Sequence, residues 1–131
     1  MLNKEEKLIY PNLSYVITGL CFRVQNQLSR YCKEKQYSDL FEKYLLTEKI
    51  SFKREYEMKG SGNRLDYLID GRVILEIKAR VAIGKNDYYQ LQRYLQMFDI
   101  KLGLLVNFRD RYLKCKRIIR IDTKNKQKYV N

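Results

Sequence analysis

Two acids and a lysine stand in the most apolar stretch of the sequence. Residues 64–80 read RLDYLIDGRVILEIKAR, with Asp66 in the first hydrophobic run and Glu76 and Lys78 in the second. The Asp-Gly pair between the runs is typical of a β-hairpin turn. Carboxylate oxygens bind Mg²⁺ or Mn²⁺, and a lysine beside them can orient a water or offset charge on a phosphate. The segment therefore predicts a hairpin with the chemistry of a divalent-metal site.

The register of this hairpin decides whether the acids meet, because side chains alternate across a strand. A two-residue turn pairs Asp66 with Leu75 and puts Asp66 and Glu76 on opposite faces. A type I turn with Gly71 in the left-handed region, followed by a bulge, restores the parity. We prefer this second register because it alone sorts the apolar residues. In this register one face of the hairpin carries Leu65, Tyr67, Ile69, Val73, Leu75 and Ile77. The other face carries Asp66, Leu68, Ile74, Glu76 and Lys78.

Two interpretations of these polar residues stay open. In the first, Asp66, Glu76 and the carbonyl oxygen of Ile77 hold the metal, while Lys78 acts on the water or the phosphate. In the second, the patch is an ordinary surface on which Lys78 pairs with one of the acids. The spacing D-x9-E-x-K is common by chance, so spacing alone favours the second interpretation.

The elements that must position these groups follow from the hydrophobic pattern. Helices are predicted over residues 13–31, with Val16, Leu20, Val24 and Leu28 in a buried stripe, over 37–50, with Ser38 or Asp39 as N-cap, and from Asn86 or Asp87 to Phe98. Strands are predicted over 51–59, in both arms of the hairpin, and over 100–108 and 114–122. The order α-α-β-β-β-α-β-β predicts one α/β domain over residues 1–131, with a mixed sheet flanked by helices. Residues 1–11 and 123–131 are expected to be frayed tails.

Composition narrows the class of protein. The net charge is +12, from 27 Lys and Arg against 15 Asp and Glu, which favours a polyanionic partner but does not choose between nucleic acid and an anionic membrane. The absence of histidine excludes Ser-His and Cys-His hydrolases and His-based zinc sites. Three scattered cysteines and no signal peptide lead us to expect a reduced, cytoplasmic setting.

Two further segments extend the pattern of the hairpin. After RLDYLIDGRVILEIKA come YQLQRYL and KLGLLVNF. Together these segments resemble the PD-(D/E)XK nuclease superfamily, and within it the GxxExxY branch, over roughly residues 17–119. The motif of that branch falls on Tyr31, Glu34 and Tyr37, with Tyr31 in place of the glycine. Leu65 stands where the superfamily name has a proline.

The resemblance implies a role for each matched acid and for the lysine. Asp66 and Glu76 match the metal ligands, and Lys78 matches the catalytic lysine. Glu34 matches the helical acid that holds the metal or its water. The alternative for Asp66 and Glu76 is a buried ion pair with Lys78. Lys78 could instead be a strand lysine that reaches to solvent, and Glu34 could be a solvated acid of its helix.

The resemblance also implies residues that support the site and contact the phosphate backbone. Gln90 and Tyr94 lie four residues apart on one helix face, and they match the motif with this role, although Tyr94 could equally be ordinary packing. Basic residues expected to contact phosphate are Arg80, Lys85, Arg93 and Lys101.

The resemblance as a whole implies a restriction-endonuclease-like α/β fold and Mg²⁺- or Mn²⁺-dependent hydrolysis of phosphodiester bonds. Nucleic acid, with DNA foremost, is the expected partner, a membrane is not, and a homodimer is left open. One rival is a catalytically inactive nucleic-acid-binding module, which the altered GxxExxY motif favours. Another is a protein-interaction scaffold, which predicts neither metal dependence nor salt-sensitive binding to DNA.

Overall fold

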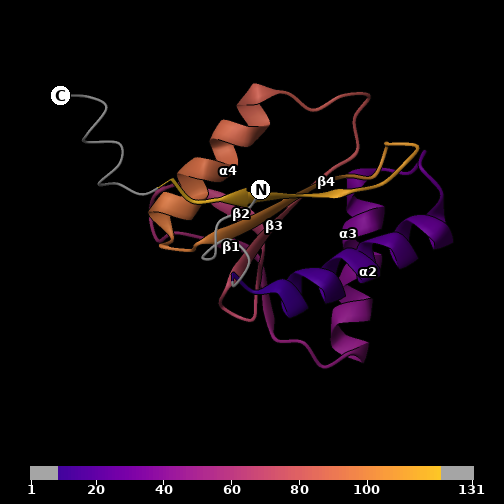
Figure 1. Cartoon of the computed structure of the whole chain (residues 1–131), viewed down its shortest axis with the longest axis horizontal. Coiled ribbons are helices and arrows are strands. Elements are labelled where there is room, and N and C mark those ends of the chain that lie inside the picture. Colours follow the sequence, from indigo (N-terminus) through magenta and orange to yellow (C-terminus); the bar gives the residue numbers. More distant parts are fainter. Residues whose placement is uncertain (1–8, 122–131) are drawn as a thin grey trace.

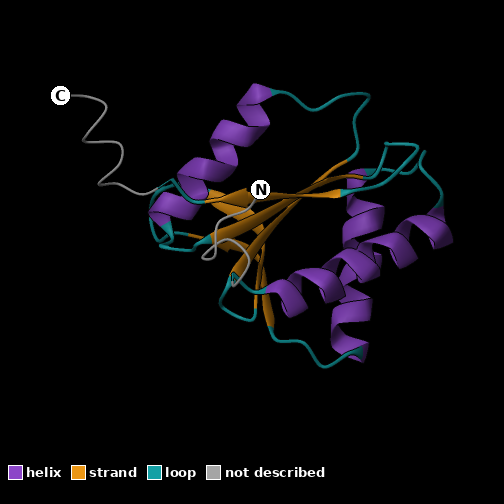
Figure 2. Cartoon of the chain, viewed as in Figure 1, coloured by secondary structure: helices purple, strands orange, loops and turns teal. Residues whose placement is uncertain are grey.

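Five strands form one mixed sheet, and helices cover both of its faces (Figures 1 and 2). The computed structural model describes residues 9–121. Along the chain the elements are α2 (Pro11–Leu28), α3 (Glu34–Thr47), β1 (Phe52–Glu57), β2 (Arg64–Ile69), β3 (Val73–Lys78), α4 (Lys85–Met97), β4 (Leu102–Asn107) and β5 (Cys115–Ile119). This order confirms the predicted α/β fold with a mixed sheet flanked by helices. None of these helices is long and apolar enough to cross a membrane.

The strands follow chain order across the sheet, from β1 to β5. All neighbouring strands are antiparallel except β3 and β4, which run parallel because α4 carries the chain back between them. All six residues of β4 are buried, as expected for a strand with helices on both faces. The C-terminal ends of β3 and β4 lie side by side, with Lys78 paired to Asn107.

Each face of the sheet has its own hydrophobic core. Tyr67, Leu75 and Leu104 pack under α2 and α3 on one face, and Ile74 and Leu105 pack under α4 on the other. Figure 1 shows this division, with α2 and α3 together on one side of the strands and α4 on the other. The sheet is therefore the middle of three layers.

The β2–β3 hairpin has the predicted odd register, because Ile69 pairs with Val73. Its turn differs from the predicted type I. Asp70 and Gly71 both have positive φ, 52° and 64°, and the Arg72 N–H donates to the Ile69 carbonyl at 3.0 Å. These are features of a type I′ turn, whose handedness suits the twist of the two strands. Arg72 is the extra residue that restores the parity.

The β1–β2 ladder is interrupted between Arg54 and Tyr56, where Glu55 has a φ of 52°. Arg54 faces α3, whereas Tyr56 packs against the core under α4. β2 changes face at the same level. Leu65 consequently lies in the core under α4 and not beside Tyr67, so the predicted face assignment of Leu65 is wrong.

α2 begins and ends earlier than the predicted 13–31. Pro11, which was expected in a frayed tail, is the first helical residue, a position that suits proline. Val16 is 41% exposed and lies outside the buried stripe, which is formed by Ile17, Leu20, Cys21 and Val24. Residues 1–8 of the first predicted tail lie outside the described residues. The whole of the second predicted tail, 123–131, lies outside them as well.

α3 also begins earlier than predicted, at Glu34 and not near Tyr37. Its N-cap is Lys33, whose backbone N–H donates to Oε1 of Gln36 at 2.9 Å, so the predicted cap at Ser38 or Asp39 is wrong. The reason lies in Tyr37. Its hydroxyl donates to the Ser29 carbonyl at 2.7 Å, which binds the first turn of α3 to the end of α2.

Candidate active site

The candidate site lies where β2 and β3 separate. The β2–β3 ladder ends at Tyr67 and Leu75, and beyond it side chains replace carbonyl groups as hydrogen-bond acceptors. Asp66 donates its backbone N–H to Oε2 of Glu76 at 2.7 Å, and Ile77 donates its N–H to Oδ2 of Asp66 at 2.7 Å. Backbone donors thus hold the two carboxyl groups next to each other in the opening between the strands.

Glu76 is almost completely enclosed, with 3% of its surface exposed. The pKa of Glu76 is raised to about 9, mainly by burial and then by the charge of Asp66, whereas the Asp66 N–H and the charge of Lys78 act in the opposite direction. A carboxyl group with this pKa keeps its proton at neutral pH. Without a cation, Glu76 is therefore uncharged at neutral pH.

A cavity of about 560 Å³ opens beside this pair. Its walls come from α3, β1, β2 and β3 and consist of Glu34, Lys35, Ser38, Asp39, Arg54, Glu55, Asp66 and Ile77. Partial burial and the charge of Asp66 raise the pKa of Glu34, while the charges of Lys78 and Arg80 lower it. The structure thus brings Glu34, Asp66 and Ile77 to one cavity, with Lys78 close enough to act electrostatically on the acids.

The side chains here suit a hard divalent cation. Two carboxyl groups and a main-chain carbonyl are the oxygen donors that Mg²⁺ and Mn²⁺ bind, and a cation would favour the ionised form of Glu76 against the burial and the Asp66 charge that raise its pKa. Among residues 9–121, however, no three Asp, Glu or Cys side chains are grouped tightly enough to hold a metal ion by themselves. Glu34 shares the cavity with Asp66, and its part in binding a metal stays a prediction.

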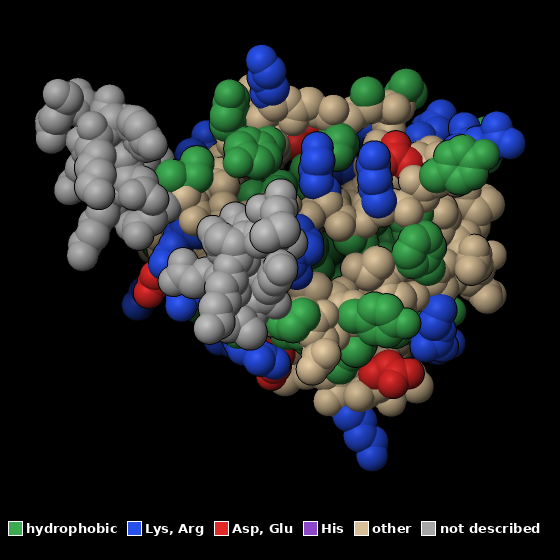
Figure 3. Space-filling view, in the orientation of Figure 1, with side chains coloured by type: hydrophobic (Ala, Val, Ile, Leu, Met, Phe, Trp, Pro, Cys, Tyr) green, Lys and Arg blue, Asp and Glu red, His purple; other side chains and the backbone are tan. Residues whose placement is uncertain are grey.

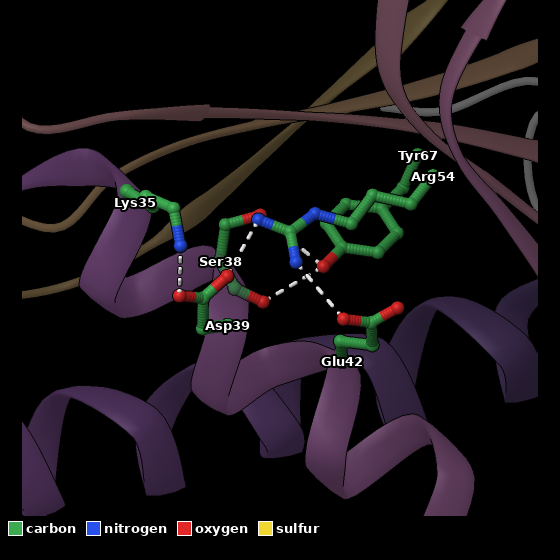
Figure 4. Close-up of polar contacts among 6 residues, drawn as sticks. All are labelled: Lys35, Ser38, Asp39, Glu42, Arg54 and Tyr67. Atoms are coloured by element: carbon green, nitrogen blue, oxygen red, sulfur yellow. Dashed lines mark hydrogen bonds and ion pairs between the residues drawn. The ribbon is translucent and has the colours of Figure 1, made fainter.

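An arginine of β1 that lines the cavity binds two acids of α3 (Figure 4). Arg54 forms ion pairs with Asp39 at 2.8 Å and with Glu42 at 2.9 Å. Next to it, the Tyr67 hydroxyl donates to the Ser38 carbonyl at 2.7 Å. Figure 4 shows the guanidinium between the two acids of the helix. These contacts fix the first half of α3, and with it Glu34, relative to the sheet.

Gln90 and Tyr94, the two site residues predicted on α4, have different surroundings. Tyr94 is 6% exposed, and burial, followed by the charges of Glu76 and Asp66, raises the pKa of its hydroxyl. Tyr94 therefore lies close to the acids. Gln90 is half-buried, and its side chain forms no hydrogen bond within the part of the chain described. Gln92 instead ties α4 to the end of β5 by donating to the Ile119 carbonyl at 2.7 Å.

Arg80 is the predicted phosphate contact that lies nearest the acids. It lies two residues after the end of β3 and forms an ion pair with Asp87. Burial raises the pKa of Asp87, but the Gly84 N–H and Arg80 outweigh it and hold that pKa below its ordinary value. Arg80 is thus tethered at the exit of β3 while half of its side chain stays exposed, 49%.

The other predicted phosphate contacts lie farther away. Lys85 lines a separate cavity of about 380 Å³ with Tyr88 and Tyr89, and Arg93 lines another of about 630 Å³ beside the same two tyrosines. Lys101 precedes β4, whose first residue pairs with the first residue of β3. The length of β3, roughly 16 Å, therefore separates Lys101 from Lys78.

Basic side chains are spread widely over the surface. Figure 3 shows Lys and Arg around most of one face, with Asp and Glu confined to small separate spots. This distribution agrees with the net charge of +12. A polyanion approaching this face would meet a positive field from several directions.

The sheet, its covering helices and the opening with its acids and lysine define a restriction-endonuclease-like domain. The sequence model of the PD-(D/E)XK nuclease superfamily matches residues 11–121, and the chain belongs to this superfamily. No curated protein and no solved structure matches the chain. The resemblance predicted from the hairpin and the two segments after it is therefore confirmed for the superfamily.

Several residues around the site were not predicted as site residues, among them Lys35, Ser38 and Asp39 of α3. Arg54 and Glu55 line the cavity from β1. Asn107, 1% exposed, accepts the Arg80 N–H at 3.0 Å and donates to the Arg80 carbonyl at 2.8 Å. The sequence held a signal for Asn107, a polar residue at the end of the apolar run KLGLLV. It held none for Glu55, whose conformation depends on its neighbours in the sheet.

Proposed function

We propose that the protein is a metal-dependent nuclease that hydrolyses phosphodiester bonds, with DNA as the expected substrate. The arrangement of Asp66 and Glu76 is the observation that carries the proposal. Each accepts a backbone N–H from the opposite strand at 2.7 Å, and Asp66 lines a cavity that also contains Glu34. Membership of a nuclease superfamily supports the same conclusion.

The proposed chemistry divides among the residues of the site. Asp66 and Glu76, with the carbonyl oxygen of Ile77, would hold Mg²⁺ or Mn²⁺. Such an ion, when bound, lowers the pKa of a water and polarises a phosphate. Lys78 would orient the attacking water or neutralise charge on the phosphate. Glu34 would accept a hydrogen bond from that water across the cavity.

The proposed contacts to the phosphate backbone follow from position. Arg80 lies beside the acids, so it would bind the phosphate next to the scissile one. Tyr94 and Gln90 support the site from α4, with Tyr94 close to Glu76. Lys85 and Arg93, which lie farther out on α4, would contact more distant phosphates and supply affinity without reading sequence.

A second candidate function is binding to nucleic acid without cleavage. Two observations favour it. Tyr31 occupies the glycine position of the GxxExxY motif, and no three acids within residues 9–121 are grouped tightly enough to form a metal site. This module would bind DNA equally well with Mg²⁺ and with EDTA, and it would cleave none.

A cleavage assay separates the two candidates. The substrates are linear, nicked, branched and single-stranded DNA, each incubated with Mg²⁺, Mn²⁺ or EDTA. The enzyme is compared with Lys78→Ala and with Lys43→Ala, an exposed lysine of α3 that lines none of the cavities described above. We expect metal-dependent cleavage by the wild type and Lys43→Ala, and none by Lys78→Ala. If the wild type binds the substrates and cleaves none of them, the second candidate is established.

A further inference from the structure

Two loops meet at the end of the sheet where the candidate site lies. One is the α2–α3 connection, residues 29–33, and the other is the β4–β5 loop, residues 108–114. Figure 1 shows them side by side. Nε2 of Gln25 donates to the carbonyls of Phe108 and Asp110 at 2.9 and 2.8 Å, and Tyr37 stacks on Phe108 with ring centroids 4.4 Å apart. The pair of loops is therefore built as one firm surface.

An exposed tyrosine with two arginines stands on this surface. Tyr31 is 69% exposed, and the guanidinium carbons of Arg30 and Arg109 lie 5.1 and 5.3 Å from its ring centroid. Tyr112 is 78% exposed and has Arg111 at 5.4 Å. We call these five residues the Tyr31 platform. None of its three arginines forms an ion pair with an acid among residues 9–121.

The platform adjoins the candidate site through the backbone. The Phe108 N–H donates to the Lys78 carbonyl at 2.9 Å, so the β4–β5 loop leaves the sheet directly beside the lysine. Asn107 holds Arg80 through both of its main-chain groups. On the other loop, Glu34 follows Tyr31 by three residues. A strand with a phosphate at the acids would have its neighbouring nucleotides next to the platform.

From this arrangement we propose that the Tyr31 platform is a stacking site for an unpaired base, and that the substrate is single-stranded at or beside the bond to be cleaved. This inference rests on the proposed function, and it names the form of its substrate. In a duplex both faces of a base are covered by its neighbours, so an exposed tyrosine ring can stack only on a base outside the helix. The arginines of the platform then bind the adjacent phosphates, and the Tyr112 ring can stack on a second base.

The test measures binding in EDTA, so that no substrate is cleaved. The probe is a short single-stranded oligonucleotide that contains 2-aminopurine, a base whose fluorescence falls when it stacks. The same sequence as a blunt duplex is the second probe. The proteins are the full chain as wild type, Tyr31→Ala, Tyr31→Phe and Tyr15→Ala. Tyr15 is the matched control, since it is 81% exposed and lies on α2, outside the platform.

We expect Tyr31→Ala to weaken single-strand binding by about tenfold and to abolish the fluorescence change, while binding to the duplex changes little. Tyr31→Phe and Tyr15→Ala should behave like the wild type. Equal losses on both probes, or no loss on either, would overturn the stacking site. Tyr31-dependent binding without cleavage in any metal would remove the nuclease proposal and leave the stacking site standing. A wild type that binds neither probe would contradict both.

Discussion

At the scale of single residues, the site depends on a carboxyl group that is costly to bury. Glu76 is 3% exposed, and its pKa is raised to about 9. In an unfolded chain a glutamate has a pKa of about 4.3. The folded chain therefore keeps a proton that the unfolded chain releases at any pH between these values. This difference gives the metal-free fold a characteristic dependence on pH.

We predict that the free energy of unfolding in EDTA falls as the pH rises from about 5 to about 9. Because the raised pKa favours the protonated form, the stabilisation is complete below the unfolded pKa and is lost as the pH approaches the folded pKa. One proton of difference allows a slope of up to about 1.4 kcal/mol per pH unit. Urea denaturation at a series of pH values measures it.

Glu76→Gln cannot lose a proton, so its unfolding free energy should vary less with pH than that of the wild type. Glu57→Gln is the control, because Glu57 is an exposed acid of β1 and should leave the slope unchanged. Equal slopes for the wild type and Glu76→Gln would show that Glu76 does not retain its proton in the folded state.

The sequence was enough to predict that Asp66 and Glu76 lie together, but not the conformation of Glu55 beside them. The alternation of Asp66, Glu76 and the apolar residues allowed the register to be predicted, because a single-residue slip would have buried the wrong face. The left-handed Glu55, at the interruption of the β1–β2 ladder, was not predictable. A backbone φ of this kind is set by tertiary contacts, and the FKREYE pattern around it is that of an ordinary strand.

At the scale of elements, α3 is joined to the sheet by ionic contacts on the side of the cavity. Arg54, with 21% of its side chain exposed, bridges Asp39 and Glu42 of the helix. The amphipathic pattern predicted α3, but not this bridge or its true start. The first turn is set by Lys33, Gln36 and Tyr37, and lysine is not among the residues that signal an N-cap in a sequence.

We predict that Arg54→Met loosens α3 and thereby weakens cleavage through Glu34, which begins the helix. Hydrogen exchange of the α3 amides should become faster, the melting temperature should fall by a few degrees, and the rate of cleavage should fall further than stability accounts for. Arg23→Met is the control, since the Arg23–Glu48 pair is 3.4 Å long and about half-exposed. Faster exchange in α3 with unchanged cleavage would contradict the positioning of Glu34 by this helix.

α4 approaches β4 closely at one glycine. A Cβ added to Gly103 would lie 2.9 Å from the Cγ, Cδ1 and Cδ2 atoms of the fully buried Leu91. We predict that Gly103→Ala destabilises the fold by about 1–3 kcal/mol through overpacking. Leu91→Ala should cost about 2–5 kcal/mol through the cavity it leaves.

The double variant tests whether these costs have one origin. The methyl group at position 103 would fill part of the space left by Leu91→Ala, so the combined loss should be smaller than the sum by about 1 kcal/mol or more. Gly19→Ala is the control, because no heavy atom lies within 4 Å of its added Cβ in α2, and it should be neutral or stabilising. Additive losses in denaturant unfolding would mean that Gly103 and Leu91 do not compete for the same space.

At the scale of the whole molecule, charge is the dominant property. The net charge of +12 and the wide distribution of Lys and Arg in Figure 3 predict that nucleic-acid binding weakens steeply with salt. Each neutralised phosphate of a duplex contributes a slope of about −0.9 to log K against log salt, so roughly four contacts would lower affinity about 100-fold between 50 and 200 mM salt. Fluorescence anisotropy at several salt concentrations measures this slope. A flat response would remove nucleic acid as the partner and favour the scaffold.

The layered fold as a whole was predictable because its period-2 and period-3.6 segments alternate clearly along the chain. What the sequence left open was the depth of the acids. Spacing places Asp66 and Glu76 on neighbouring strands, but it does not give the 3% exposure of Glu76, which depends on how distant parts of the chain pack on the sheet.

The most direct test of the account is the rate at which the wild type and Asp66→Asn cleave one oligonucleotide substrate at saturating protein. Asp66 is chosen because it both lines the cavity and contacts Glu76. We expect cleavage by the wild type in Mg²⁺ or Mn²⁺, none in EDTA, and a loss of about 100-fold or more in Asp66→Asn, with binding to the substrate kept. Cleavage in EDTA, or by Asp66→Asn at the rate of the wild type, would contradict a metal-dependent nuclease built on this pair of acids.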